Sequence, residues 1–190
     1  MSNPEIIKVP SVTYKLRNLK RNAWADITLR EWCRGGSFQC QSSYGEFAYI
    51  WRAIGDDGIK DFLCSLDKDY FLKKTRPNDY MVFSNKLTCK RIKKDIIEQR
   101  KEVLITKEEA HQCWEECNCL ESNNSRNSNE FFFCLEKNTN LFEPCMLVEK
   151  IYMDDWLSIP TVYIYNPQYD AFWDNVWSVI VEYWQKEQQK

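Results

Sequence analysis

The 190-residue chain contains little glycine and proline, with five and six residues respectively. Such a composition excludes long flexible linkers and low-complexity segments. No apolar run approaches the ~20 residues that are needed to cross a bilayer. The first ten residues also lack the basic region and apolar stretch of a secretory signal. We therefore expect a cytoplasmic protein that has no membrane among its partners.

Histidine is scarcer still, because His111 is the single one, and this excludes catalytic mechanisms that need two. With Cys113, Cys117 and Cys119 it forms the one cluster of metal-ligand residue types in the sequence. Zinc needs four such ligands in a tetrahedron. These four lie on one predicted helix, and only Cys113 and Cys117 share its inward face. We expect no metal, no cofactor and no catalytic residue.

Nine cysteines, an odd number, are spread along the chain. Several stand within apolar patterns, such as Trp32-Cys33 and Leu63-Cys64, rather than between turns. Stable disulfides are typical of exported proteins, and nothing in the sequence predicts export. Our interpretation is that the thiols are free and mostly buried.

Apolar residues are what the chain has in quantity: 44% of it is hydrophobic and 15% aromatic, with eight tryptophans. A chain of this length can bury a core without disulfides or metals. No linker composition divides it. The sequence therefore predicts an N-terminal tail over residues 1–10 and a single domain over residues 11–190.

The spacing of apolar residues predicts strands first and helices afterwards. Apolar and polar residues alternate between residues 11 and 51, which predicts three or four antiparallel strands with a hairpin turn at Gly35-Gly36. From Ile59 to Tyr70 the apolar residues recur at helical spacing and predict one helix. Residues 80–83 predict another short strand.

Helix signals dominate the middle of the chain. Ser84 can cap a long helix that ends near Leu104, with Val103 on its inward face. Thr106 and Glu109 have the spacing of a capping box, which predicts the start of the next helix.

The C-terminal part ends in the most strongly patterned helix. Residues 121–129 predict a loop, and residues 161–165 predict a last short strand. Asn166-Pro167 then supplies an N-cap and a proline at the first helical position. The helix that follows has an unbroken apolar stripe that includes Trp177 and Trp184. The predicted fold class is α+β: an N-terminal antiparallel β-sheet packed against helices, with a Trp-rich C-terminal helix.

Charge is divided along the sequence. Residues 1–101 hold 20 Lys and Arg against 12 Asp and Glu, a net charge of +8, whereas residues 102–190 hold 6 against 16, a net charge of −10. An asymmetry of this kind bears on partners rather than on fold.

Two candidate binding surfaces follow from this division. The leading one is acidic, because an acidic surface can occupy a basic groove built for DNA or RNA. Its residues are Glu108, Glu109, Glu115, Glu116, Glu121, Asp154 and Asp155. The second is a basic helix face that can follow phosphates, with an ordinary solvated face as the competing interpretation. Its residues are Lys86, Lys90, Lys93, Lys94 and Lys101.

Several motifs in the sequence resemble a widespread family of small phage and prophage proteins. The first reads Ser42-Ser43-Tyr44-Gly45-x-Phe47-x3-Trp51, then Phe62-Leu63-x2-Leu66-Asp67-x-Asp69-Tyr70-x2-Lys73. The last reads Asn166-Pro167-Gln168-x3-Phe172-Trp173-x3-Trp177. The resemblance covers the chain from about residue 12 and implies a phage-encoded accessory protein in the cytoplasm of a bacterial host. It brings no catalytic residues with it.

In that context the predicted function is a non-enzymatic inhibitor that binds and blocks a host defence complex, a protein or ribonucleoprotein such as a CRISPR effector. One alternative is a nucleic-acid-binding accessory protein that uses the lysine face. The second is a metal-dependent enzyme centred on Asp67 and Asp69, although neighbouring carboxylates more often belong to a helix N-terminus or a solvated loop.

Overall fold

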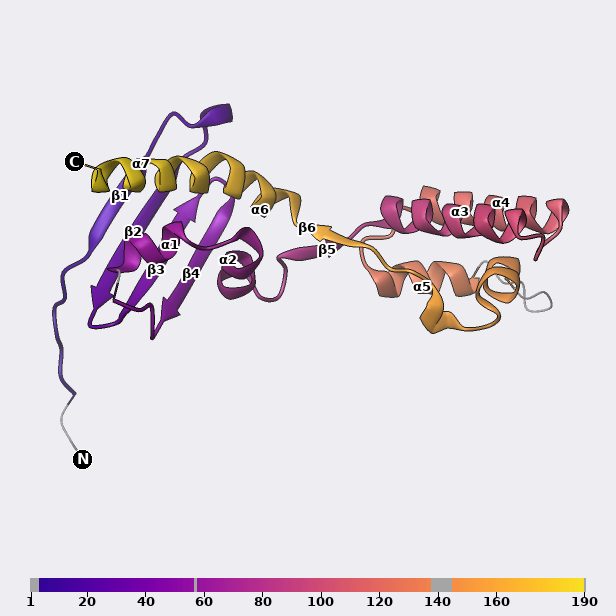
Figure 1. The fold of residues 1–190 in the computed structure, drawn as a ribbon, viewed down its shortest axis with the longest axis horizontal. Coiled ribbons are helices and arrows are strands. Elements are labelled where there is room, and N and C mark those ends of the chain that lie inside the picture. The colour runs from indigo at the N-terminus through magenta and orange to yellow at the C-terminus, as the bar shows by residue number, and fades with distance from the viewer. Residues whose placement is uncertain (1–3, 57, 138–144, 190) are drawn as a thin grey trace. The chain divides into compact units, whose positions relative to one another are not determined.

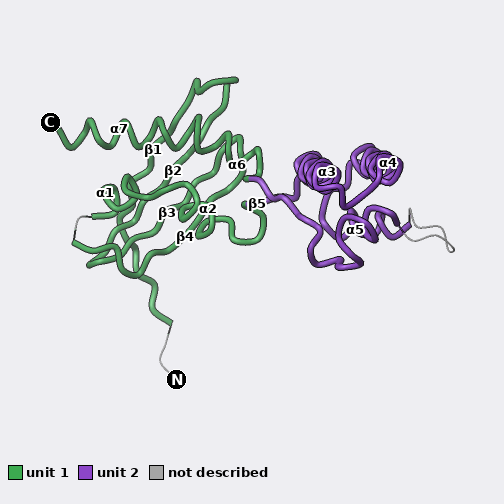
Figure 2. Tube along the Cα trace, turned by 45° about the vertical axis from the view of Figure 1, so that its right-hand side comes forward, with its two compact units in different colours: residues 1–80, 165–190 green, residues 81–164 purple. Residues whose placement is uncertain are grey.

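The computed structural model of the chain describes residues 4–56, 58–137 and 145–189. They group into two compact units, residues 1–80 with 165–190 (the sheet unit) and residues 81–164 (the helical unit) (Figure 2). Each unit has its own hydrophobic core. The sequence predicts a single domain over residues 11–190, and this stays a prediction.

Four antiparallel strands form the sheet of the sheet unit, in the order β1-β2-β3-β4. They are β1 (Val12–Leu16), β2 (Ala25–Trp32), β3 (Gly35–Ser42) and β4 (Gly45–Trp51). The register places Leu29 opposite Phe38 and Cys40 opposite Phe47, so one face of the sheet is apolar. The prediction of an N-terminal antiparallel sheet is confirmed.

The hairpin between β2 and β3 turns at a different place from the one predicted. Cys33 and Arg34 form the turn. This tight turn requires a positive φ, and Arg34 adopts a φ of 59°. Gly35 and Gly36 lie inside β3. At Gly36 an added Cβ would stand 2.7 Å from the Cδ1 of Ile59, so glycine is needed here for close packing rather than for turning.

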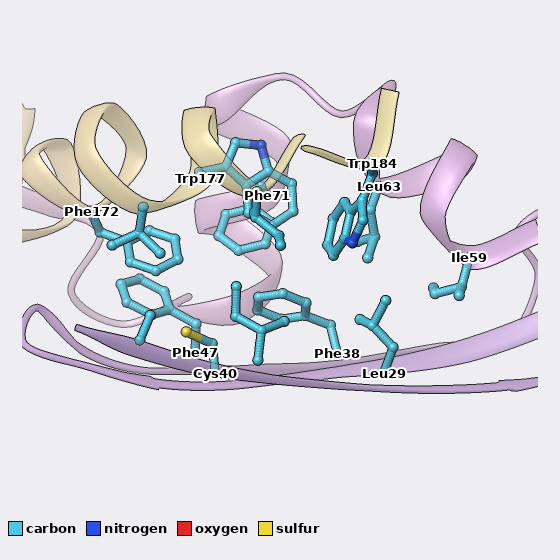
Figure 3. Packing of buried hydrophobic residues seen from close by; sticks show 14 of the residues in the cluster. Leu29, Phe38, Cys40, Phe47, Ile59, Leu63, Phe71, Phe172, Trp177 and Trp184 are labelled. Atoms are coloured by element: carbon cyan, nitrogen blue, oxygen red, sulfur yellow. The ribbon is translucent and has the colours of Figure 1, made fainter. Parts of the chain in front are cut away.

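Helices cover the apolar face of the sheet (Figures 1 and 3). They are α1 (Gly58–Cys64), α2 (Lys68–Thr75), α6 (Pro167–Phe172), the π-helical η4 (Trp173–Trp177) and α7 (Ser178–Gln188). The one helix predicted from Ile59 to Tyr70 is two, because Asp67 caps a new helix by accepting a hydrogen bond from the Tyr70 N–H. At the C-terminus, Asn166 and Pro167 begin α6 as predicted.

Aromatic rings fill the space between the sheet and these helices (Figure 3). Phe47 of β4 stacks on Phe172 with 3.9 Å between ring centroids. Trp177 lies 4.2 Å from the ring of Phe71 and meets Phe38 edge-on at 5.6 Å. Residues from both ends of the chain therefore build one core, as the predicted Trp-rich stripe requires.

The helical unit holds α3 (Asn85–Lys101), α4 (Lys107–Asn123), α5 (Ser128–Lys137), the π-helical η2 (Leu147–Ile151) and the short 3-10 helix η3 (Trp156–Ser158). The chain enters it through β5 (Met81–Phe83) and leaves through β6 (Tyr163–Tyr165), which pair with each other. The predicted cap at Ser84 and the capping box of Thr106 and Glu109 are both present. None of the helices in the described ranges is long and apolar enough to cross a membrane.

Two boundaries in the helical unit differ from the prediction. Val103 lies beyond the end of α3, with a φ of 58° and 77% of its surface exposed, rather than on the inward face. The N–H groups of Val103 and Leu104 bond back to α3 and close it, so that Thr106 can cap α4. In addition, α4 continues through Glu121 to Asn123 and ends at Asn124, whose φ of 50° provides the left-handed C-cap.

Trp177→Ala tests whether the C-terminal helix is core. Removing a buried Trp side chain typically costs ~3–5 kcal/mol, out of a total stability of ~5–15 kcal/mol for a small protein. We expect a large fall in melting temperature and poor solubility, measured by thermal denaturation. Val179→Ala, on the exposed side of α7, is the matched control and should change stability little. Unchanged melting of the Trp177 variant would contradict the packing described.

Candidate functional site

Half of the charge division of the sequence lies in two neighbouring helices. α3 carries seven Lys and Arg against two acidic residues, and α4 carries one against five. The two helices lie side by side (Figures 1 and 2). Lys93 of α3 pairs with Glu121 of α4 at 2.5 Å and lies over the ring of Trp114. Part of the asymmetry is therefore neutralised inside the unit.

Glu116, one of the predicted surface residues, is committed to the fold. Its carboxylate accepts hydrogen bonds from the N–H groups of Met146 at 3.2 Å and Leu147 at 2.8 Å. The Cys145 thiol donates to it at 3.2 Å. These are N–H groups at the start of η2, which have no partner within their own helix. Glu116 thus fastens η2 to α4.

Three more of the predicted acidic residues have structural partners. The Thr106 N–H and hydroxyl lower the pKa of Glu109, which also pairs with Lys150 at 3.8 Å. The hydrogen bond to Glu121 raises the pKa of Lys93. Asp155 caps η3, and the Ser158 hydroxyl lowers its pKa. These residues stabilise the unit whatever else they bind.

Glu108, Glu115 and Asp154 are the remaining members of the acidic surface. All three are exposed. Within the described part of the chain none of them forms an ion pair, and Glu115 accepts a single long hydrogen bond from Asn118 at 3.4 Å. Glu108 and Glu115 stand on α4, and Asp154 lies in the turn after η2, where its N–H bonds to the carbonyl of Val148.

The predicted lysine face divides in the same way. Lys86, Lys90 and Lys101 are exposed and form no ion pair among the residues described. Lys93 pairs with Glu121, and Lys94 pairs with Glu98 at 3.4 Å. The face is therefore less positive than its lysine count indicates.

An apolar hollow of about 580 Å³ lies among these lysines and was not predicted. Its apolar lining is Leu87, Ile97, Trp114 and Val162, and its basic lining is Lys90, Arg91, Lys93 and Lys94. We call it the α3 hollow. Leu87 is 38% exposed and Ile97 is 43% exposed. Both stand on α3 away from its buried stripe, so the two apolar residues on the lysine-bearing side of the helix were the signal that could have revealed the site.

The carboxylates of the enzyme alternative, Asp67 and Asp69, are both engaged. Asp67 caps α2 by accepting the Tyr70 N–H at 2.8 Å. Asp69 pairs with Lys73 at 2.7 Å, and the Tyr165 hydroxyl donates to it at 3.4 Å. Among the residues that the structure describes, no three His, Cys, Asp or Glu side chains gather in a way that could hold a metal ion.

The cysteine and histidine cluster of α4 separates as the helical spacing indicates. Cys113 and Cys117 are buried, whereas His111 and Cys119 are exposed. Burial raises the pKa of Cys113 to about 12. All nine cysteines are free in the structure, in agreement with the predicted free thiols.

Comparison with protein families assigns the origin of the chain. The family model Phage_phiTE_072, described as a phage family, matches residues 5–187. The chain belongs to this phage family. The resemblance to phage proteins is thereby confirmed. A comparison with curated proteins gives no match, and a comparison with solved structures gives none either.

Two adjacent glutamates of this phage-family protein allow a matched test of the acidic surface. Glu116→Ala leaves the N–H groups of Met146 and Leu147 without their acceptor, which should cost ~1–3 kcal/mol. Glu115→Ala removes an exposed carboxylate and should change stability by less than ~0.5 kcal/mol. Urea unfolding of both variants measures the difference. Equal stabilities would show that Glu116 does not fasten η2.

Thiol reactivity tests the burial of the cysteines. Cys33 and Cys119 are exposed and should react at once with a disulfide reagent at neutral pH. Cys113 and Cys145 should react only after unfolding, because burial raises the pKa of each thiol to about 12 and leaves almost no thiolate. Mass spectrometry of the labelled, folded protein identifies the modified residues. Rapid labelling of Cys113 or Cys145 would contradict the packing.

Proposed function

We propose that this phage-family protein is a non-enzymatic inhibitor that binds a host defence complex, such as a CRISPR effector, and blocks it by occupying a basic surface. The observation that carries the proposal is the set of exposed carboxylates of the helical unit, Glu108, Glu115 and Asp154. They have no ion-pair partner among the described residues. A basic groove built for a nucleic acid is a partner that would neutralise them.

Rigidity favours this mode of binding. Glu116 and the pair of Lys150 with Glu109 hold η2 against α4, and the Asp154 N–H bonds back to Val148 of η2. The backbone that bears the carboxylates is therefore ordered before any partner arrives. A preorganised surface loses less conformational entropy on binding. Clustered charge of one sign also accelerates encounter with a surface of the opposite sign. Phage-family membership supplies the biological setting for a host target.

A nucleic-acid-binding accessory protein is the second candidate. The exposed Lys86, Lys90 and Lys101 favour it. Against it, Lys93 and Lys94 are neutralised in part by Glu121 and Glu98. Lys90, Lys93 and Lys94 also line an apolar hollow, whereas affinity for a phosphate backbone comes from unpaired cationic groups. The enzyme alternative has weaker support, because Asp67 and Asp69 serve as a helix cap and an ion-pair partner.

Reversing the exposed acidic charge tests the proposal. We would change Glu108, Glu115 and Asp154 to Lys and leave Glu116 unchanged, because it holds η2. The readout is plating of a targeted phage on a CRISPR-immune host that expresses each protein. The native protein should restore plating, and the triple variant should not. With purified effector, the triple variant should associate about ten- to a hundredfold more slowly at low salt, a difference that shrinks as salt rises.

The matched control changes Lys86, Lys90 and Lys101 to Ala. It should keep its inhibitory activity if the carboxylates dock. Nucleic-acid binding requires the reverse: tight binding to a generic DNA duplex that only the lysine variant loses, with a salt slope reduced by about 0.9 for each phosphate contact removed. Failure of the native protein to restore plating against the host's defence systems would refute the inhibitor proposal.

A further inference from the structure

We propose that the helical unit binds a second copy of this chain, with the segment 153–157 of one copy seated in the α3 hollow of another. This interaction goes beyond the proposed inhibition, because it needs no host component. Both surfaces lie on the same chain, neither is covered by the residues that the structure describes, and their chemistry is complementary.

Residues 153–157 form an ordered turn that displays apolar side chains to solvent. Met153 is 77% exposed, Leu157 is 96% exposed and Trp156 is 37% exposed. Exposed Trp, Met and Leu side chains that are close in sequence are unusual on a surface that stays in water. Trp is also among the residues that most often anchor protein interfaces.

The backbone holds this turn in a strained conformation. Met153 has a φ of 50° and Asp154 a φ of 61°, values that side-chain-bearing residues rarely adopt. Hydrogen bonds from the Asp154 N–H to Val148 and from the Asp155 N–H to Tyr152 keep the chain in place. The Asp155 carboxylate then accepts the Leu157 N–H at 3.0 Å. The apolar side chains are thus presented by a fixed turn.

The α3 hollow has the opposite properties. It is a concave surface whose apolar lining includes Leu87, Ile97 and Trp114, whereas the turn exposes Met153 and Leu157. Of its four basic lining residues, Arg91, Lys93 and Lys94 pair with carboxylates of α3 and α4, whereas Lys90 has no ion-pair partner among the residues described. The turn is acidic at Asp154 and Asp155. Leu157 or Met153 can therefore enter the hollow while an aspartate meets Lys90 at its rim.

The contact joins two different surfaces of the same protein. Such a contact either closes reciprocally, with each copy giving its turn to the hollow of the other, or continues head to tail. In both cases it covers Leu157 and Ile97, which are exposed in the single chain. The association should be reversible, since one turn and one hollow form a small interface.

Sedimentation of the purified full-length protein tests the proposal. The native protein should sediment faster as its concentration rises through the micromolar range. Leu157→Asp should weaken the association at least about tenfold, because it places a charge in the apolar hollow. Val179→Asp, an equivalent change on the surface of α7 in the sheet unit, should leave it unchanged. A native protein that remains monomeric at all concentrations would overturn the proposal.

A charge swap identifies the two surfaces. Asp154→Lys and Lys90→Glu should each prevent association alone, because each sets like charges against each other across the contact. An equimolar mixture of the two variants should associate again, since the lysine introduced on the turn of one then meets the glutamate introduced on the rim of the other. Thermal denaturation of each variant confirms that it is folded. Restored association in the mixture supports the proposed pairing, and its absence while both variants are folded contradicts it.

The sedimentation test is independent of the host-binding proposal. No defence complex is present, and neither Leu157 nor Lys90 belongs to the carboxylates proposed to dock on the host. A protein that associates but does not restore phage plating would keep the self-contact and remove the inhibitor proposal. A protein that stays monomeric but restores phage plating would keep the inhibitor proposal and remove the self-contact.

Discussion

The sheet unit depends on one interaction that joins the two ends of the chain. The apolar face of β1–β4 is covered by α1, α2 and the helical run from Pro167 to Gln188. Phe172 stacks on Phe47, and Trp177 packs at a tilt against Phe71. The core is therefore incomplete until the C-terminus returns to a sheet made at the N-terminus. Contacts so distant in sequence are costly to form first, because they close a long loop. Residues 81–164 leave the sheet unit by β5 and return by β6, and they form a helical unit with a core of its own.

The core of the helical unit combines aliphatic side chains and the rings of Phe83 and Phe131 with four buried thiols. α3 and α4 bring their Cys89, Cys113 and Cys117 into one core, and Lys93 and Glu121 pair across the two helices. Glu116 then adds η2 to this pair through three hydrogen bonds. The acidic residues of the helical unit fall into two groups. Some are internal fasteners, and others are left exposed with nothing to neutralise them among the residues described.

Helices and strands that depend on neighbouring residues were predicted well from the sequence. Features that depend on residues far apart in the sequence were not predicted. The caps at Ser84, Thr106 and Asn166 rest on hydrogen bonds within four residues, and all three are present. The sheet followed from strict alternation, and the C-terminal helix from its apolar stripe. The hairpin turn was misplaced because Gly36 is required by Ile59, more than twenty residues away. The role of Glu116 depends on N–H groups about thirty residues downstream, which no spacing rule reveals. The α3 hollow needs Val162 and Trp114 beside α3, and only the fold brings these together.

The net charge of a segment does not show which of its charges are paired in the folded protein. Only the charges that stay unpaired at the surface can bear on binding. The boundary near residue 101 separates two helices that pack together, so the structure converts a long-range asymmetry into a short-range pairing. The charges that remain unpaired at the surface include Asp154, in the turn after η2, and Lys90 on α3. Under the two proposals, Asp154 takes part both in self-association and in docking on a host complex. One carboxylate cannot make both contacts at once, so each binding event must oppose the other by the same free energy. Self-association would then prevail where the protein is abundant and its target is scarce. When the target is present, its binding to single chains would shift the equilibrium away from the self-associated form.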